Sequence, residues 1–361
     1  MVQITPDINP IAKIKVLGIG GSGGNALNRM IKANLDQIDF VAINTDAQAL
    51  YHNEAPYKIN VGKNLTRGLG AGSDPNLGKK AAEESIEEIK EMLEETDMVF
   101  ICCGLGGGTG TGGAPIIAEA AKEMGILTVA VVTKPFSFEG ARRRETAEQG
   151  LEELKDKVDT IITIPNDKVL ALIDKKTPLV DAFAVVDDVL RQGIQGISDL
   201  VTIHGMVNVD FADVNSIMKN AGSALMGIGY GTGENRAIEA ARSAIDSPLL
   251  ELSINGAKGV LMNITGGSDL SMFEVDEAAK IITEAADPEA NIIFGAVIDD
   301  SATGEIKITV IATGFDEKAQ KKLKEDRASK RINPLTQAPL GVSNEESELD
   351  IPAFIRKKVK S

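Results

Sequence analysis

The residues CCGLGGGTGTGGAP (102–115) are half glycine, and two threonines, Thr109 and Thr111, stand between the later glycines. Glycine loses more conformational freedom on folding than any other residue, so a run of this density marks backbone that approaches something closely. The run follows an apolar segment of strand length, 97–104, and precedes a helical pattern at 114–125. It is therefore a strand-to-helix loop, the position at which open α/β sheets bind their ligands.

Two further glycine-rich loops, GIGGSGG (18–24) and GLGAGSDP (68–75), lie next to helical patterns in the first half of the chain. Apolar runs alternate there with helical patterns: strands are expected at 14–20, 39–45, 97–104, 126–135 and 159–166, and helices at 25–33, 75–95, 114–125 and 145–158. Strands that are apolar on both sides and alternate with helices predict a parallel sheet covered by helices on both faces.

The second half of the chain has a different pattern of apolar and polar residues. Residues 178–203 carry one long helical pattern that begins at Pro178 and is weakened by Gly193 and Gly196. A second, smaller α/β domain follows, with helices expected near 213–221, 233–246 and 274–286 and strands at 258–267, 291–299 and 305–314. Beyond Phe315 the apolar pattern fades into a polar tail. The fold class is thus α/β: a Rossmann-like parallel sheet, a long central helix and a smaller α/β domain.

The three glycine loops are expected to meet at one edge of the sheet, where free helix N–H groups and helix dipoles favour anions. Together they offer enough backbone donors for a di- or triphosphate. A P-loop would place a lysine on the phosphates, and the chain has no such motif. Threonine hydroxyls stand there instead, and a divalent cation would have to offset the phosphate charge. The competing interpretation is that the loops are only tight turns and helix caps.

The first loop also contains a literal G-x-G-x-x-G at Gly18, Gly20 and Gly23. This is the dinucleotide-binding fingerprint, so a dinucleotide-dependent oxidoreductase is the alternative function. Against it, the second strand ends in INTDAQ rather than in a lone ribose-binding acid, and two further phosphate loops would have no role.

Composition narrows the possible functions. A net charge of −15 and a pI near 4.8 argue against a nucleic-acid-binding surface, which needs clustered Lys and Arg. No segment has the apolar length of a membrane span or of a signal peptide. The two cysteines, Cys102 and Cys103, are adjacent in an apolar run and are expected to be reduced and buried. We expect a cytoplasmic protein.

At GGGTGTG (106–112), preceded by Gly104, the sequence resembles the tubulin/FtsZ GTPase superfamily, and within it the FtsZ family of cell-division proteins. The resemblance covers nearly the whole chain and is weakest at 316–346. Ser22 is a departure, because the family usually has a further glycine there. The segments that match in order are NTDAQAL (44–50), GLGAG (68–72), VTKPFSFEG (132–140), ITIPNDK (162–168), NVDFADV (208–214) and ELDIPAFIRKK (348–358).

The resemblance implies bound GTP or GDP, with Mg²⁺ expected beside the nucleotide and no dedicated cluster of protein ligands for the metal. It implies that the nucleotide is lined by Gly21, Ser22, Gly23, Gly24 and Asn25, with Ala71 and Gly72 near the γ-phosphate, Gly108, Thr109 and Gly110 on the phosphates, Glu139 and Arg143 on the ribose side, and Asn166, Phe183 and Asp187 around guanine. A carboxylate suits guanine, whose N1–H and 2-amino groups are both donors. Without the resemblance, Asp187 would be assigned to the solvated face of a helix.

The resemblance also implies the domain limits: a flexible N-terminus (1–12), a GTP-binding domain (13–177), a central helix (178–204), a C-terminal activation domain (205–315), a linker (316–346) and a docking peptide (347–361).

Carboxylates that could activate water occur in NVDFADV, as Asp210 and Asp213 beside Asn208. The competing interpretation is that Asp213 caps the helix that begins at Val214. Asp187 and Asp210 are 23 residues apart, mostly along one predicted helix, which spans about 30 Å at 1.5 Å per residue. If Asp187 holds guanine, Asp210 reaches only the nucleotide of a neighbouring subunit. This predicts a head-to-tail filament, and the resemblance implies the same.

Partners follow from these features. The chain is expected to bind itself and, through 348–358, a membrane-tethering adaptor and division regulators, whereas nucleic acid and a direct membrane span are not expected. The resemblance places such a protein at the division site. A third class, a tubulin-like structural protein that does not hydrolyse nucleotide, is disfavoured by the intact NVDFADV loop.

Overall fold

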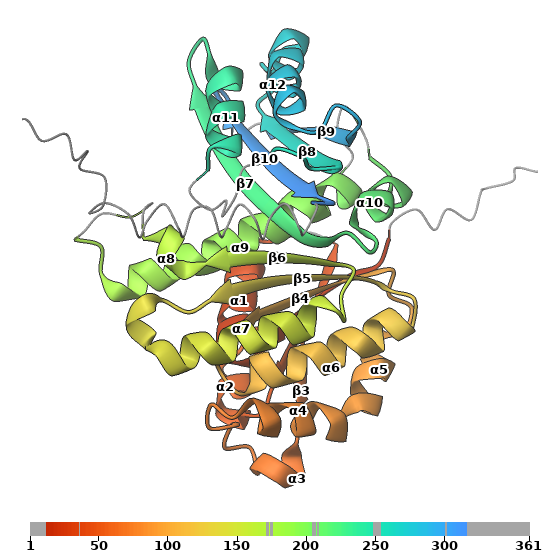
Figure 1. Ribbon diagram of the computed structural model, residues 1–361, viewed down its shortest axis with the longest axis vertical. Coiled ribbons are helices and arrows are strands. Elements are labelled where there is room, and N and C mark those ends of the chain that lie inside the picture. Colours follow the sequence, from red (N-terminus) through yellow and green to blue (C-terminus); the bar gives the residue numbers. More distant parts are fainter. Residues whose placement is uncertain are drawn as a thin grey trace, which may run out of the picture. The chain divides into compact units, whose positions relative to one another are not determined.

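The computed structural model describes residues 12–315, apart from 36, 171–172, 174–175, 204–206, 208, 248–253 and 300–301. Asn208, residues 1–11, the predicted linker and the docking peptide lie outside the described residues. One sheet of ten strands runs through the described part in the order β3-β2-β1-β4-β5-β6-β7-β10-β8-β9 (Figure 1). The strands are β1 Ile14–Ile19, β2 Ile38–Asn44, β3 Tyr57–Asn60, β4 Met98–Gly104, β5 Leu127–Lys134, β6 Thr160–Pro165, β7 Gly222–Thr232, β8 Gly259–Gly266, β9 Asn291–Ile298 and β10 Glu305–Thr313.

The helices are α1 Gly20–Lys32, α2 Ala47–Tyr51, α3 Lys63–Thr66, α4 Pro75–Glu84, α5 Ile86–Leu93, α6 Thr109–Glu123, the 3₁₀ turn η1 Ser137–Glu139, α7 Ala141–Lys155, α8 Asn166–Val169, α9 Leu179–Thr202, α10 Phe211–Met218, α11 Arg236–Ile245 and α12 Met272–Ala285. Within the described residues, none of these helices is long and apolar enough to cross a membrane.

The parallel half of the sheet, β3 to β6, is covered on both faces, as predicted. Helices α1 and α9 pack with Val16, Phe100 and Cys102 on one face. On the other, α4, α5, α6 and α7 pack with Ile101 and Cys103. Both cysteines are therefore fully buried free thiols, which confirms the prediction. Burial raises the pKa of Cys103 to about 12, so its thiol stays protonated.

The sheet continues into the second half through β7, a strand that the sequence prediction missed. Its first residues pair in parallel with β6, and the rest pairs antiparallel with β10. β7 contains Gly229 and Gly231, and glycine is depleted in strands, which hid the pattern. Both glycines are required by packing: a Cβ at either position would overlap a carbonyl oxygen of α11, which lies directly on the strand.

The central helix α9 begins after Pro178 and runs unbroken for 24 residues, close to the predicted 178–203. Gly193 and Gly196 do not break it. A Cβ at Gly193 would lie 2.8 Å from Sδ of Met226 in β7, and one at Gly196 would lie 2.7 Å from Cγ2 of Thr309 in β10. The two glycines therefore let α9 pack closely against the second half of the sheet.

Helix boundaries differ from the predictions in a way that matters for function. The helices predicted to begin at 25 and 114 begin at Gly20 and Thr109, so only the later glycines of both loops lie in the first turns of α1 and α6. The long helix predicted at 75–95 is two helices, α4 and α5, separated at Ser85. The short edge strand β3 was also missed.

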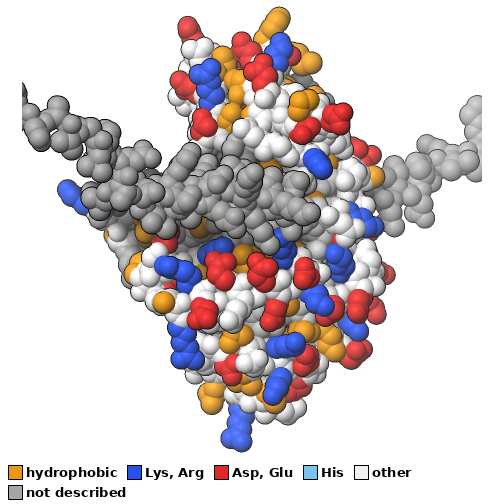
Figure 2. Space-filling view, in the orientation of Figure 1, with side chains coloured by type: hydrophobic (Ala, Val, Ile, Leu, Met, Phe, Trp, Pro, Cys, Tyr) orange, Lys and Arg blue, Asp and Glu red, His pale blue; other side chains and the backbone are white. Residues whose placement is uncertain are grey.

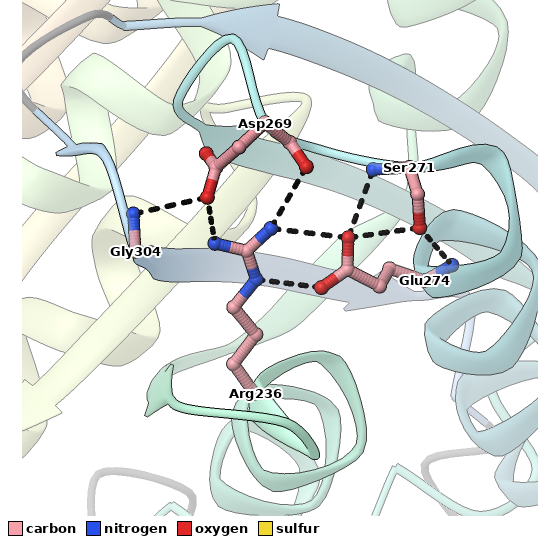
Figure 3. A network of polar contacts seen from close by, with 5 residues as sticks. All are labelled: Arg236, Asp269, Ser271, Glu274 and Gly304. Atoms are coloured by element: carbon pink, nitrogen blue, oxygen red, sulfur yellow. Dashed lines mark hydrogen bonds and ion pairs between the residues drawn. The ribbon is translucent and has the colours of Figure 1, made fainter.

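The second half has its own polar anchor, Arg236 at the start of α11 (Figure 3). Arg236 is 6% exposed and donates to Asp269 at 2.6 Å and to Glu274 at 2.6 and 3.1 Å. Glu274 also accepts from the amide and hydroxyl of Ser271, and Asp269 accepts from the amide of Gly304. One guanidinium thus ties the start of α11 to the loop before α12 and to the turn before β10.

Charge is distributed evenly on the face shown in Figure 2, where acidic and basic side chains are interspersed over the lower part of the view.

Candidate functional site

The three glycine loops meet at the carboxyl ends of the parallel strands. A Cβ at Gly20 would lie 3.2 Å from the amide nitrogen of Gly110, which places the start of α1 against the start of α6. A Cβ at Gly108 would lie 2.8 Å from Cβ of Ala71 and 2.9 Å from the amide nitrogen of Asp74, which places the third loop against the same point. At Gly104, a Cβ would overlap the hydroxyl of Ser22.

Two of these helices begin without a side-chain cap. In the described part of the chain, no side chain accepts a hydrogen bond from the first amides of α1 or α6. Helix α4 differs, because Asp74 accepts from the amide of Asn76 at 2.9 Å. Helix capping therefore accounts for the loop before α4, but not for the glycine loops at the starts of α1 and α6. Uncapped amides at two adjoining helix starts are suited to binding an anion.

The two threonines have different roles. Thr111 is buried, and its hydroxyl accepts from the amide of Gly106 at 2.9 Å, so it shapes the loop. The expectation that its hydroxyl faces a ligand is wrong. The hydroxyl of Thr109 lies 2.7 Å from that of Thr45, at the end of β2, and links two loops across the site. Asp46, the acidic residue after β2, caps α2 by accepting from Gln48 and Ala49. The carboxylate of Asp46 is thus used in capping, whereas the acidic residue of a dinucleotide-binding fold would be expected to bind ribose.

A cavity of about 190 Å³ lies beside the start of α1. Its lining includes three of the predicted nucleotide residues, Gly21, Gly24 and Asn25. Ser22 and Gly23 lie in the same turn. Ala71 and Gly72 lie in the loop before α4, and Gly108, Thr109 and Gly110 lie at the start of α6.

On the side predicted to face ribose, Glu139 and Arg143 lie together. Glu139 accepts from the amide of Phe136 at 2.8 Å and pairs with Arg143 at 3.1 Å. The stem of Arg143 covers Gly106, where a Cβ would lie 2.7 Å from its Cγ. The pair therefore borders the loop at 104–112.

The three residues predicted to hold guanine come from α8 and α9. Asn166 is 6% exposed, and its Oδ1 is buried with no hydrogen-bond partner among the described residues. Phe183 is 39% exposed and contacts Phe136 edge to face, with ring centroids 5.3 Å apart. A buried acceptor without a hydrogen-bond partner, such as Oδ1 of Asn166, is rare in folded proteins, and a bound ligand would supply the missing donor.

Asp187 is 8% exposed, so it does not lie on a solvated helix face. Its Oδ2 accepts from Nε of Arg29 in α1 at 3.0 Å. Burial raises the pKa of the Asp187 carboxyl above its usual value, and Arg29 offsets part of that effect. Sequence reasoning missed Arg29. The signal was its place one helical turn after Asn25, on the same face of α1.

Asp210 and Asp213 are exposed at the start of α10, where Asp210 is the N-cap. The helix begins at Phe211 rather than at Val214, so Asp213 is not its cap but its third residue. Val207, just before this loop, bridges to Ala296 in β9. The loop therefore lies beyond the far end of α9 from Asp187. The described residues contain no cluster of three or more His, Cys, Asp or Glu that could hold a metal.

Comparisons with known proteins match both halves of the chain. The GTPase-domain model of the tubulin/FtsZ family matches residues 13–174, and the FtsZ family C-terminal-domain model matches residues 222–316. A solved M. jannaschii structure, "FtsZ dimer, empty", is 47% identical, covers 84% of this chain and 89% of its own, and has a TM-score of 0.81. A GTPγS-bound CetZ2 protofilament from Haloferax volcanii is 19% identical, with coverage of 89% and 99% and a TM-score of 0.72, so it shows only the shared fold.

Proposed function

Because this chain belongs to the FtsZ family of tubulin-like GTPases, we propose that it is a cell-division protein that binds GTP, assembles head to tail into filaments and hydrolyses GTP between subunits. The observation that carries the proposal is the meeting of the uncapped starts of α1 and α6 at the carboxyl ends of the parallel strands, in a sheet whose strand β6 ends directly before Asn166 with its orphaned Oδ1. The first feature suits phosphates, and the second suits a base with hydrogen-bond donors.

Within this site, the amides of Gly21–Asn25 and Gly108–Gly110 would hold the phosphates, with Ala71 and Gly72 at the γ-phosphate. Glu139 and Arg143 would contact the ribose side, and Asn166, Phe183 and Asp187 would enclose guanine. Mg²⁺ would bind chiefly through phosphate oxygens and water.

Hydrolysis would need a second subunit. Helix α9 continues for 15 residues beyond Asp187, about 23 Å, before the chain reaches the loop of Asp210 and Asp213. These exposed carboxylates would position water on the nucleotide of the next subunit, in an open head-to-tail contact. The similar M. jannaschii FtsZ structure is a dimer, which supports self-association.

A combined assay tests this function. Light scattering with GTP and Mg²⁺ is measured beside phosphate release over a range of protein concentrations. We expect scattering above a threshold concentration and a release rate per subunit that falls towards zero below it. A rate per subunit that stays constant down to concentrations without polymer would refute the shared site. Scattering without phosphate release would identify a structural, non-hydrolysing protein, and binding of NAD instead of GTP would favour the oxidoreductase alternative.

The docking peptide is a separate part of the proposal. ELDIPAFIRKK (348–358) combines Leu349, Ile351, Pro352, Phe354 and Ile355 with a basic end, and a flexible tether of about 30 residues reaches about 30 Å. It would link cytoplasmic filaments at the division site to a membrane-bound adaptor. Deletion of 348–361 should abolish adaptor binding in a pulldown and leave GTP hydrolysis unchanged.

A further inference from the structure

Asp187, the carboxylate proposed to recognise guanine, is paired across two helices with Arg29. Nε of Arg29 donates to Oδ2 of Asp187 at 3.0 Å, joining α1 to α9. The Asp187 side chain is 12% exposed, and that of Arg29 is 41% exposed. In the described part of the chain, no hydrogen bond reaches Oδ1 of Asp187. One carboxylate oxygen is therefore held by Arg29, and the other remains for a ligand.

The charge state of this carboxyl matters for guanine. The N1–H and 2-amino groups of guanine are donors, and an ionised carboxylate accepts from both, whereas a protonated acid presents a donor of its own. Burial opposes ionisation and raises the pKa of Asp187, while the hydrogen bond and charge of Arg29 lower it. From β4, the thiol of Cys102 also faces Asp187, and burial raises the pKa of that thiol, so it stays neutral.

We propose that Arg29 is a positioning residue for guanine recognition: its guanidinium keeps the buried Asp187 carboxylate ionised and turns Oδ1 towards the base. This inference rests on the proposed function. Arg29 follows Asn25 by one turn of α1, so the helix that presents its first amides to the phosphates also supplies the counter-ion of the guanine site.

The test is the pH dependence of nucleotide affinity, measured by displacement of a fluorescent GDP analogue at protein concentrations below assembly. The variants are Arg29→Met, which removes the charge, and Arg29→Lys, which retains it. Arg191→Met is the matched control, because Arg191 also pairs with an aspartate of α9, the neighbouring Asp188. Thermal unfolding at pH 8 confirms that each variant folds, and Arg29→Gln replaces Arg29→Met if the latter does not.

We expect wild-type affinity to change little between pH 6 and 8. In Arg29→Met the pKa of Asp187 is higher, so the ionised fraction falls as pH falls, and affinity should drop by up to about tenfold per pH unit below that pKa. Arg29→Lys should restore the flat profile, and Arg191→Met should match wild type. A profile for Arg29→Met that is unchanged, or weaker by the same factor at every pH, overturns the proposal.

A further variant separates this outcome from failure of the proposed function. Asp187→Asn should lose GTP and gain xanthosine triphosphate, because xanthine has an acceptor where guanine has its 2-amino donor. If Asp187→Asn retains GTP, the guanine site itself is misassigned. If it behaves as expected while Arg29→Met has a wild-type profile, only the role of Arg29 is wrong.

Discussion

Asp210 and Asp213 hydrogen-bond to each other's backbone amides: Oδ1 of Asp210 accepts from the amide of Asp213 at 2.9 Å, and Oδ2 of Asp213 accepts from the amide of Asp210 at 3.4 Å. The pair closes a capping box at the start of α10. A role in stability therefore accompanies any role in hydrolysis, and the two must be separated by choice of substitution.

Asparagine caps a helix about as well as aspartate, whereas alanine does not. We expect Asp210→Ala to lose about 1 kcal/mol of unfolding free energy, and Asp210→Asn to unfold like wild type. Both should bind GTP and release phosphate at least about 100-fold more slowly. Urea unfolding and phosphate release measure the two effects. Normal hydrolysis by a stable Asp210→Asn protein would remove Asp210 from the proposed mechanism.

Two glycines in the first turn of α1 should respond differently to alanine. A Cβ at Gly23 would overlap the carbonyl oxygen of Cys102, whereas a Cβ at Gly21 meets no atom within 4 Å. Gly23→Ala should therefore destabilise the fold by about 1–3 kcal/mol. Gly21→Ala should keep wild-type stability and lose GTP affinity, because the new methyl group enters the proposed nucleotide site.

Thermal unfolding without nucleotide and a GTP-binding titration check this pair. Gly107→Ala is the control, since a Cβ there also meets no atom within 4 Å and Gly107 is not among the predicted contacts. Equal GTP affinity in Gly21→Ala and Gly107→Ala would contradict the assignment of the first loop.

Asn166 offers a test of the orphaned acceptor. Because Oδ1 has no hydrogen-bond partner among the described residues, Asn166→Ala should cost little stability without nucleotide. Wild type should gain about 2.7 kcal/mol of stability at a GTP concentration of 100 Kd, and the variant should lose most of that gain at the same concentration. Thermal shift with and without GTP measures both values. A full ligand-induced shift in the variant would show that Asn166 does not touch the nucleotide.

The Arg236 network predicts a dependence of stability on pH. Its hydrogen bonds lower the pKa of Glu274 from 4.5 to about 2. A carboxyl group whose pKa is lower in the folded than in the unfolded state stabilises the fold at every pH above its unfolded-state pKa. This stabilisation is lost as the pH falls towards the folded-state pKa. Arg236→Met should therefore destabilise by on the order of 2 kcal/mol at pH 6, and the difference from wild type should narrow between pH 4.5 and pH 3.

Urea unfolding over that pH range provides the measurement. Arg242→Met is the control, because Arg242 lies exposed on the same helix. A destabilisation that stays constant with pH would mean that Arg236 acts through packing alone.

Much of the architecture could be predicted because the parallel strands are buried on both faces and read as apolar runs. β7 could not, since its packing against α11 selects Gly229 and Gly231 over residues with high strand propensity. For the site, glycine spacing located the loops. It did not show that the hydroxyl of Thr111 turns back onto the amide of Gly106 within the same loop. Arg29 was missed because its partner, Asp187, lies 158 residues further along the chain in another helix.

The close packing of α9 restricts how chain length can vary. Inserting one residue in an α-helix turns everything beyond it by about 100° and advances it by about 1.5 Å. An insertion before Gly193 would rotate both Gly193 and Gly196 away from Met226 and Thr309, and side chains would collide with the sheet. Among relatives, insertions and deletions should thus be absent from α9 and accumulate in surface loops. We therefore expect related proteins to have the same number of residues in this helix.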